Sequence, residues 1–414
     1  MRMNDDEHRY DTGSGPVRKH ALQEGKGEGT DHFRERRVPR WVYRVILVLF
    51  LAALAVLAWF NRANLTPENV VDWVKTSVVG MGVGDGYPKN FSGSTVAAGN
   101  FACSGKNIVY TSDTALTVCN TTGKELLSMQ HSYSSPVMRL SGVRMLLCGL
   151  GGKSAEVVTT GSGSTVPLTA GQNILGGALA PNGRSALISA ADGYCGMLTA
   201  FDASGKVLSY YWFSDYYPTA VALSPDGTKA AVTGVSAKEG ELVSAVYLIS
   251  LASGKTVRPE TVCTGNMLNA VFWDTDSTIE AVGDTGAVLL NAATSRKTEY
   301  SFNGAQLTAF CSEGGRLAFG LAPYAGSPDS RIVVLSPSGS EAYSGKLSGK
   351  ILSVSLSGQT AAALTAGKLY FCSLASSAAP RTSNVGSDAC AVALKDESSA
   401  YVLGISTVSL VNRG

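Results

Sequence analysis

The strongest constraint on the fold is a two-strand pattern that recurs along most of the 414-residue chain. Each copy has a short apolar stretch, a polar turn that often contains Gly or Asp, and a second apolar stretch, as in GALAPNGRSALIS and VALSPDGTKAAVTG. The eight copies lie near residues 100, 137, 177, 221, 270, 308, 354 and 392, so neighbours are about 37 to 49 residues apart. This period is typical of the blades of a β-propeller.

A second phrase follows each copy, an apolar strand and a turn of small residues, as in LTAFDASGKVL and IVVLSPSGSEA. The unit is therefore strand a, turn, strand b, loop, strand c, turn, strand d. Such short strands, separated by Asn-Gly, Asp-Gly and Ser-Gly turns, are typical of four-stranded antiparallel blades. We predict an all-β fold, an eight-bladed β-propeller, with seven blades as the alternative. A pair of sandwiches would not give eight matching units, and the rungs of a β-helix are shorter than ~40 residues.

The last repeat stops after its third strand, because the chain ends at Gly414. A blade that lacks a strand would expose an edge, and propellers usually close by taking the missing strand from the other end of the chain. We therefore predict that residues 91–98 supply the fourth strand of the eighth blade.

Residues 1–40 have a different composition from the rest of the chain. They hold nine Lys/Arg and eight Asp/Glu, and their few apolar residues follow no helical or strand period. Because such a segment buries too little apolar surface to offset its ordering entropy, we predict a disordered tail. A solvated spacer is the default interpretation, and a binding segment for a cytoplasmic partner is the alternative.

Residues 41–60, WVYRVILVLFLAALAVLAWF, predict a transmembrane helix. No charged or hydroxyl side chain occurs in residues 45–60, and about 20 helical residues span a bilayer core of ~30 Å. RERRVPR precedes this stretch and a lone Arg62 follows it, which predicts a cytoplasmic N-terminus and an extracytoplasmic C-terminal domain in the cell membrane. A cleaved signal peptide is the alternative, but a charged lead of 40 residues is too long for its n-region.

Residues 61–90 are predicted to join the membrane helix to the propeller, residues 91–414. Thr66 suits an N-cap and Pro67 the first helical position, which predicts a short helix over about residues 67–77. The following GMGVGDGYPKN, residues 80–90, has a glycine at every second position from Gly80 to Gly86. It lacks the spacing and the flanking strand and helix of a phosphate-binding loop, so we interpret it as a hinge.

The chain resembles a family of uncharacterised single-pass β-propeller proteins of anaerobic Gram-positive bacteria, classed as a domain of unknown function. The resemblance rests on the predicted N-terminal anchor, on NLTPENVVDWVK directly after it, on GDGYP, and on the degenerate SPDG-like repeats. It covers about residues 41–414. It implies the same architecture and no known activity.

The sequence after the predicted span offers few catalytic or metal-binding side chains. His131 is its only histidine, and we expect a solvated loop residue. Asp274 and Asp276 lack the Gly and Glu spacing of a calcium loop, so we interpret them as turn residues. Phosphate-loop, serine-hydrolase and zinc-protease motifs are missing, and we predict no catalytic residue, no metal and no cofactor. Basic and acidic residues are equal in number from Val45 onward, which argues against a nucleic-acid partner.

The eight cysteines all follow the predicted span, where disulfides are permitted. They form no C-x-x-C pair, and several lie in apolar runs such as MLLCG and LYFCS. We interpret them as small buried hydrophobic residues, with a disulfide framework as the alternative.

The run SYYWFSDYYP, residues 209–218, carries six aromatic residues between strand d of the third repeat and strand a of the fourth. The d–a and b–c loops of a propeller emerge on one face, and the longest b–c insertions here are residues 191–197, 234–245 and 321–331. Exposed Tyr and Trp offer large, rigid contacts at low entropic cost. Our candidate ligand-binding residues are therefore Tyr210, Tyr211, Trp212, Tyr216 and Tyr217. The alternative is that alternate members of the run fill the space between two blades.

We expect a membrane-anchored, extracytoplasmic propeller that binds a protein, peptide or glycan at the cell envelope as a binding or scaffolding module. The alternative is a cell-surface enzyme that acts on polysaccharide at the propeller face. Such an enzyme would need convergent carboxylates or a Tyr/His pair, and the sequence shows no such constellation.

Overall fold

The computed structural model describes residues 45, 47–52, 82–91, 95–294, 296–376 and 378–414. The chain divides into two compact units, Met1–Leu57 and Ala58–Gly414. In the first unit, residues 45 and 47–52 are helical and their side chains are exposed. No helix within the described ranges is long and apolar enough to cross a bilayer. Most of the predicted span, the predicted tail and the predicted helix at 67–77 lie outside the described residues.

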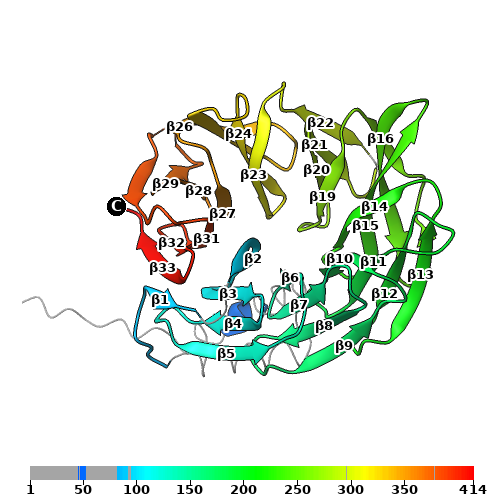
Figure 1. Ribbon diagram of the computed structural model, residues 1–414, viewed down its shortest axis with the longest axis horizontal. Coiled ribbons are helices and arrows are strands. Elements are labelled where there is room, and N and C mark those ends of the chain that lie inside the picture. The colour runs from blue at the N-terminus through cyan, green and yellow to red at the C-terminus, as the bar shows by residue number, and fades with distance from the viewer. Residues whose placement is uncertain (1–44, 46, 53–81, 92–94, 295, 377) are drawn as a thin grey trace, which may run out of the picture. The chain divides into compact units, whose positions relative to one another are not determined.

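The second unit is an eight-bladed β-propeller, as the repeat predicts. Eight antiparallel sheets follow one another in a ring (Figure 1). Blade 1 consists of β2 (Val96–Ser104), β3 (Asn107–Ser112), β4 (Ala115–Cys119) and β5 (Glu125–Gln130). Blade 2 consists of β6 (Pro136–Ser141), β7 (Arg144–Gly149), β8 (Ser154–Thr159) and β9 (Thr165–Thr169). Blade 3 consists of β10 (Ile174–Leu179), β11 (Ser185–Ser189), β12 (Gly196–Phe201) and β13 (Val207–Phe213).

Blade 4 departs from the pattern. It has β14 (Tyr217–Leu223), then the long strands β15 (Lys229–Lys238) and β16 (Glu241–Ser250), and two short strands, β17 (Lys255–Thr256) and β18 (Thr261–Thr264), that both pair with β16. The predicted insertion at residues 234–245 is thus an extension of the β15–β16 hairpin. Its turn is tight, with positive φ angles of 52° at Glu239 and 83° at Gly240.

The remaining blades return to four strands each. Blade 5 has β19 (Leu268–Phe272), β20 (Thr278–Gly283), β21 (Gly286–Asn291) and β22 (Lys297–Ser301). Blade 6 has β23 (Gln306–Glu313), β24 (Arg316–Ala322), β25 (Asp329–Leu335) and β26 (Glu341–Ser348). Blade 7 has β27 (Ser353–Ser357), β28 (Thr360–Thr365), β29 (Lys368–Ser373) and β30 (Arg381–Asn384). Blade 8 has β31 (Ala391–Asp396), β32 (Ser399–Leu403), β33 (Thr407–Asn412) and β1 (Lys89–Asn90).

The apolar runs in the repeat are the second strands of the blades. All residues of β7, β20 and β28 are buried, whereas outer strands such as β22 alternate between exposed and half-buried positions. A second strand has a neighbouring blade on both faces, so most of its positions carry apolar or small side chains, with Arg144 and Glu280 as buried charged exceptions. Eight clusters of buried residues result, each at a junction between adjacent blades.

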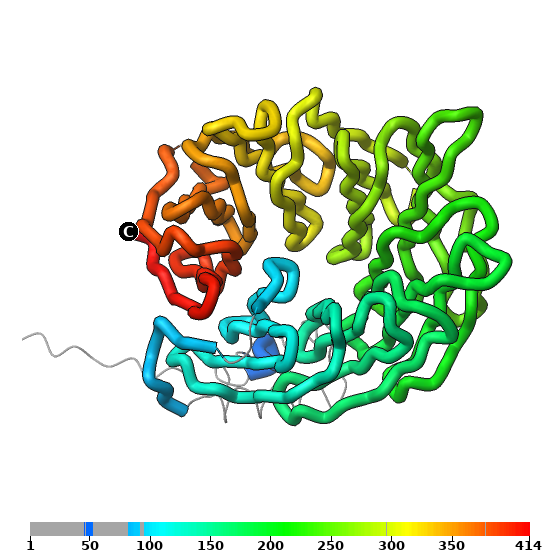
Figure 2. The backbone as a smooth tube through the Cα atoms, viewed as in Figure 1, coloured from blue at the N-terminus to red at the C-terminus, as the bar shows by residue number. Residues whose placement is uncertain are grey.

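The N-terminal side of the propeller closes the ring, as predicted, but the strand lies earlier than residues 91–98. β1 pairs with β33 through Lys89↔Val408 and Asn90↔Thr407, where blue meets red in Figure 2. Val96 already belongs to β2 of blade 1. Tyr87 and Phe91, on either side of β1, pack into the core between blades 8 and 1, which explains the position of the strand.

The glycine-rich segment is held against blade 1, so the predicted hinge is wrong for its described residues, 82–90. The amide of Gly84 donates to Thr122 Oγ1 at 2.9 Å, and that of Gly86 donates to the Thr122 carbonyl at 3.0 Å. The phenol of Tyr87 donates to the Asn120 carbonyl at 2.7 Å. A Cβ at Gly84 would overlap the backbone of residues 122–124. The glycine there permits close contact between two backbones rather than bending.

Candidate functional site

The predicted aromatic run spans the junction of blades 3 and 4. Tyr210, Tyr211 and Trp212 lie on β13, the outermost strand of blade 3. Tyr217 begins β14, the innermost strand of blade 4, and Tyr216 directly precedes it. The structure thus brings the five candidates to one junction but divides them between its interior and its surface.

Tyr216 and Tyr211 belong to the interior. Tyr216 is fully buried, and its ring lies 5.9 Å from that of Tyr247 of blade 4. The half-buried Tyr211 packs its ring edge-on against Phe213 at 4.9 Å. Both are part of the core between blades 3 and 4, so Tyr216 is not available to a ligand and Tyr211 presents only part of its ring. The alternation of side chains along a strand decides this division.

The outward members form a contiguous exposed surface. Tyr210 and Trp212 are 44% and 46% exposed, and their rings lie 5.7 Å apart. Tyr194, from the loop between β11 and β12, places its ring 6.4 Å from that of Trp212. Leu208 extends the row along β13. We call Tyr194, Leu208, Tyr210 and Trp212 the blade-3 aromatic surface. Tyr194 and Leu208 are not among the residues predicted from the sequence, although Tyr194 lies in the predicted insertion at residues 191–197.

The outer strands of the other blades show how unusual this surface is. Their exposed positions carry polar, charged or small residues, for example Glu125, Ser128 and Gln130 on β5 and Lys297, Glu299 and Ser301 on β22. The same holds for β26, β30 and β1, and the exposed positions of β9 carry two threonines and Pro167. In blade 4, β18 contributes one large apolar side chain, Val262. The fold therefore does not require apolar side chains at the exposed positions of β13.

Contacts with blade 4 fix the backbone beneath this surface. Ser209 Oγ donates to the Leu251 carbonyl at 2.6 Å. Gly254 has a φ of 61°, and a Cβ there would overlap the carbonyl oxygen of Tyr210. The turn before β17 therefore lies directly on β13. The aromatic rings project from a strand that is supported on both sides.

The face that bears the d–a and b–c connections also gathers exposed apolar side chains. No such side chain occurs in any a–b or c–d turn of the described propeller. Those in the loops and at the strand ends of the d–a and b–c face are Leu150, Leu175, Tyr194, Tyr217, Leu242, Met267, Tyr324, Leu352 and Ile405. Tyr217 is 64% exposed and belongs to this face rather than to the blade-3 aromatic surface.

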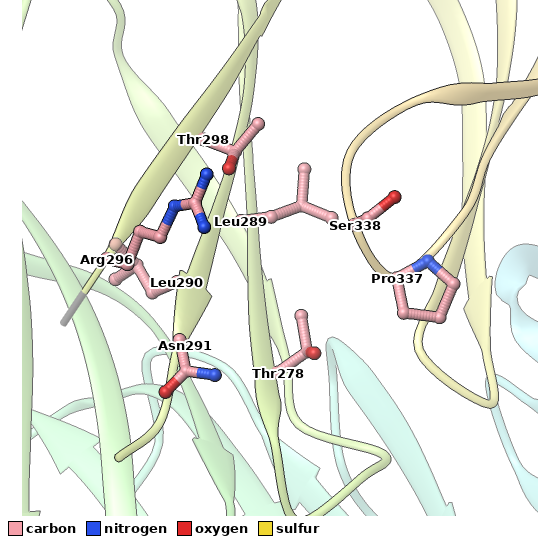
Figure 3. A pocket seen from close by; sticks show the side chains of 8 residues that line it. All are labelled: Thr278, Leu289, Leu290, Asn291, Arg296, Thr298, Pro337 and Ser338. Atoms are coloured by element: carbon pink, nitrogen blue, oxygen red, sulfur yellow. The ribbon is translucent and has the colours of Figure 1, made fainter. Parts of the chain in front are cut away.

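Two pockets lie elsewhere. One pocket, with a volume of about 210 Å³, lies between blades 5 and 6. Arg296 and Thr298 line one side of it, and Pro337 and Ser338 line the other (Figure 3). A second, of about 560 Å³, lies along β26 and the chain before β30. Neither is lined by any of the five candidate residues.

The side chains considered for catalysis have structural contacts. Both ring nitrogens of His131 meet backbone atoms: Nε2 lies 3.0 Å from the Ser112 carbonyl, and Nδ1 accepts from the Tyr133 amide at 3.3 Å. Desolvation lowers the His131 pKa. Within the described ranges, no group of three or more His, Cys, Asp or Glu residues is placed to hold a metal ion.

All eight cysteines are free, and each is buried or half-buried. Burial raises the thiol pKa of Cys103 to about 12 and those of Cys148 and Cys372 to about 11. These three thiols are therefore protonated at neutral pH and pack as small hydrophobic residues, as expected from the apolar runs around them.

The protein is therefore an eight-bladed β-propeller that carries an exposed apolar surface on the outer strand of one blade. The chain belongs to the family described as "Family of unknown function (DUF5711)", which matches residues 87–403. A comparison with curated proteins gave no match.

Solved structures share the fold at low sequence identity. BamB from Moraxella catarrhalis is 11% identical with a TM-score of 0.50, over 79% of this chain and all of BamB. The C-terminal WD40 domain of Sif2 is 10% identical with a TM-score of 0.57, over 79% of this chain and 98% of that domain. These likenesses concern the fold.

Proposed function

We propose that this protein is a membrane-anchored binding module that presents its propeller outside the cytoplasm to a partner protein. The observation that carries the proposal is the blade-3 aromatic surface, because the outer strands of six other blades expose no large apolar side chain. Exposed Tyr and Trp side chains are enriched among the residues that contribute most to binding energy. The apolar run at residues 41–60 supports the anchor and the extracytoplasmic location.

The chemistry of the surface favours a protein over a glycan. A sugar ring stacks on an aromatic face, but Leu208 adds an aliphatic side chain in the same row. No member of the surface is charged, so its centre matches an uncharged apolar patch with a polar rim. A glycan array distinguishes glycan binding from protein binding.

The described chain enters the propeller at the end opposite the one that carries Tyr194 and Trp212. The segment before β1 contacts the turn at residues 120–124, which joins β4 to β5 at the c–d end of blade 1. Tyr194 and Trp212 lie at the opposite, b–c and d–a end of blade 3.

Photo-crosslinking in native membranes tests the proposal. A crosslinking amino acid replaces Tyr210 in the full-length protein, and we expect a discrete protein adduct that disappears when Trp212→Ala is added. A crosslinker at Glu299, the exposed position on β22, is the matched control and should not give this adduct. If both positions give the same adducts, or if Trp212→Ala has no effect, the proposed surface is wrong.

A glycan array probed with the full-length protein in detergent covers the alternatives. Binding that is lost in Tyr210→Ala/Trp212→Ala but kept in Lys297→Ala/Glu299→Ala would identify a glycan ligand in place of a protein. Release of shortened glycans would indicate an enzyme instead of a binding module.

A further inference from the structure

Glu280 occupies a position that is apolar in every other blade. It lies on the second strand of blade 5, on the side that faces blade 6, and its side chain is 0% exposed. The residues that face the following blade at this position elsewhere are Val109, Leu146, Ala186, Ala231, Ala318, Ala362 and Tyr401. The fold therefore does not need a carboxyl group here, and burying one is costly.

The carboxyl group of Glu280 has one polar partner across the junction. Ser312 Oγ, on the innermost strand of blade 6, lies 2.8 Å from Glu280 Oε2. The same hydroxyl lies 2.9 Å from Oδ2 of Asp274, in the β19–β20 turn of blade 5. The other oxygen, Glu280 Oε1, is buried and has no hydrogen-bond partner.

The hydrogen-bond count then fixes the protonation of the cluster. A serine hydroxyl has one proton to donate, yet two carboxyl oxygens lie at hydrogen-bond distance from it. Both contacts are satisfied only when one carboxyl group carries a proton and donates it to Ser312 Oγ. Glu280 is the more deeply buried of the two acids, so it holds this proton while the exposed Asp274 accepts from Ser312.

The surrounding charges favour the same state. Burial, followed by the nearby Asp274 carboxylate, raises the Glu280 pKa to about 8, although Ser312 opposes this. Asp274 is exposed as a residue, but its carboxyl group contacts Ser312 of blade 6, and the loss of hydration there raises its pKa as well. From blade 6, the Glu313 carboxylate at the end of β23 interacts with Asp274 and also with Arg316 at the start of β24, whose guanidinium group donates to the Gly358 carbonyl at 2.6 Å. Leu289 on β21 and Phe272 on β19 flank Glu280 within its own sheet, and neither is charged.

We infer that Glu280, Ser312 and Asp274 form a proton-dependent latch between blades 5 and 6, which is closed while Glu280 is protonated and weakened when it ionises. After Glu280 ionises, the Ser312 hydroxyl can donate to only one of the two carboxylates. The negative charge of Glu280 is then buried next to that of Asp274, and Glu280 Oε1 has no hydrogen-bond partner. Opening the junction admits water to that charge.

The direction of the pH dependence follows from linkage. The Glu280 pKa is about 8 in the closed junction and returns toward its usual 4.5 when water enters. The closed state therefore binds more protons between these values, and its stability falls as pH rises across this window and is constant above it. Each pH unit inside the window raises the opening constant about tenfold.

Amide hydrogen exchange of the full-length protein in detergent measures this opening. We expect the protection of β20 and β23, corrected for the intrinsic effect of pH, to fall by about 50-fold between pH 6 and pH 8. The control is the junction of blades 6 and 7, where Ala318 takes the place of Glu280. Its protection should change little.

Two variants separate the latch from general pH effects. In Glu280→Gln, the amide still donates to Ser312 but cannot ionise, so protection should not depend on pH. Asp274→Asn changes an exposed turn residue and removes a negative charge that raises the Glu280 pKa, so the upper limit of the window should move to lower pH and the loss of protection between pH 6 and pH 8 should be smaller. Equal pH dependence at both junctions, an unchanged dependence in Glu280→Gln, or an unshifted window in Asp274→Asn would overturn the latch.

Discussion

At the scale of single residues, alternation along β13 assigns the aromatic side chains to two different tasks. Tyr211 and Phe213 point into the core between blades 3 and 4, while Tyr210 and Trp212 point to solvent. Leu208, two residues before Tyr210, is exposed on the same side of the strand. Neighbouring residues of one short run can thus have opposite roles.

Substitution of the two adjacent tyrosines at the junction tests this division. Tyr216→Ala should lower the free energy of unfolding by about 3 kcal/mol, because it leaves a cavity at a fully buried site. Tyr217→Ala, at a 64% exposed position, should change it by less than about 0.5 kcal/mol. Chemical denaturation of both variants gives the comparison, and equal losses would contradict the assignment.

At the scale of elements, the segment before β1 acts as a clasp on blade 1. Its backbone donates to Thr122 twice, and the side chains of Asn120 and Thr122 donate to the Gly82 carbonyl at 2.8 and 3.1 Å. Lys89 Nζ donates to the Gly123 carbonyl at 3.0 Å. These contacts join the closing strand of blade 8 to blade 1, so the element spans the point where the ring closes.

A single methyl group should weaken this clasp. Gly84→Ala should lower the melting temperature by several degrees, because its Cβ would overlap the amide nitrogen of Lys124. Gly99→Ala is the matched control, since a Cβ there has no atom within 4 Å. Thermal unfolding of both variants checks the expectation, and the clasp would be unsupported if the two melted alike.

At the scale of the whole molecule, the ring depends on pairing between residues about 320 positions apart, Lys89 with Val408 and Asn90 with Thr407. Such a contact carries a large loop-closure entropy in the unfolded chain. Apolar packing between blades 8 and 1 stabilises the ring at the same place. Closure therefore links the stability of the first and last blades.

Truncation tests the role of the closing strand. A chain that starts at Val96 should melt roughly 5 °C or more below one that starts at Gly82, because it exposes the edge of β33 and loses Tyr87 and Phe91 from the core. The chain that starts at Gly82 serves as the control for removal of the earlier residues. Identical melting curves would show that β1 does not stabilise the ring.

Protease treatment of intact cells tests the proposed topology. If residues 41–60 anchor the chain with its N-terminus inside, external protease should degrade the propeller and leave an N-terminal fragment protected. Antibodies against tags at each terminus follow the two ends. Protection of the C-terminal tag until the cells are lysed would contradict the proposed location.

The sequence by itself determined the repeat, the antiparallel unit of four strands and the closure from the N-terminal side, and it favoured eight blades while leaving seven open; the structure settles eight. These depend on local patterns: short apolar strands, glycine turns at a regular period, and a final repeat with three strands. The sequence also placed an aromatic run at one blade junction. It could not show which rings face solvent, because that depends on the register of β13 against β12.

Only the tertiary structure decided the features that depend on contacts between distant residues. The glycine-rich segment reads locally as a hinge, yet its fit against residues 120–124 makes it a fixed clasp. Tyr194 joins Trp212 because the β11–β12 loop folds over the end of β13. Glu280 reads as one polar residue in an apolar strand, and its role depends on a serine 32 residues away that lies on the next blade. Pairings across blades are set by the packing of the ring, which no local pattern encodes.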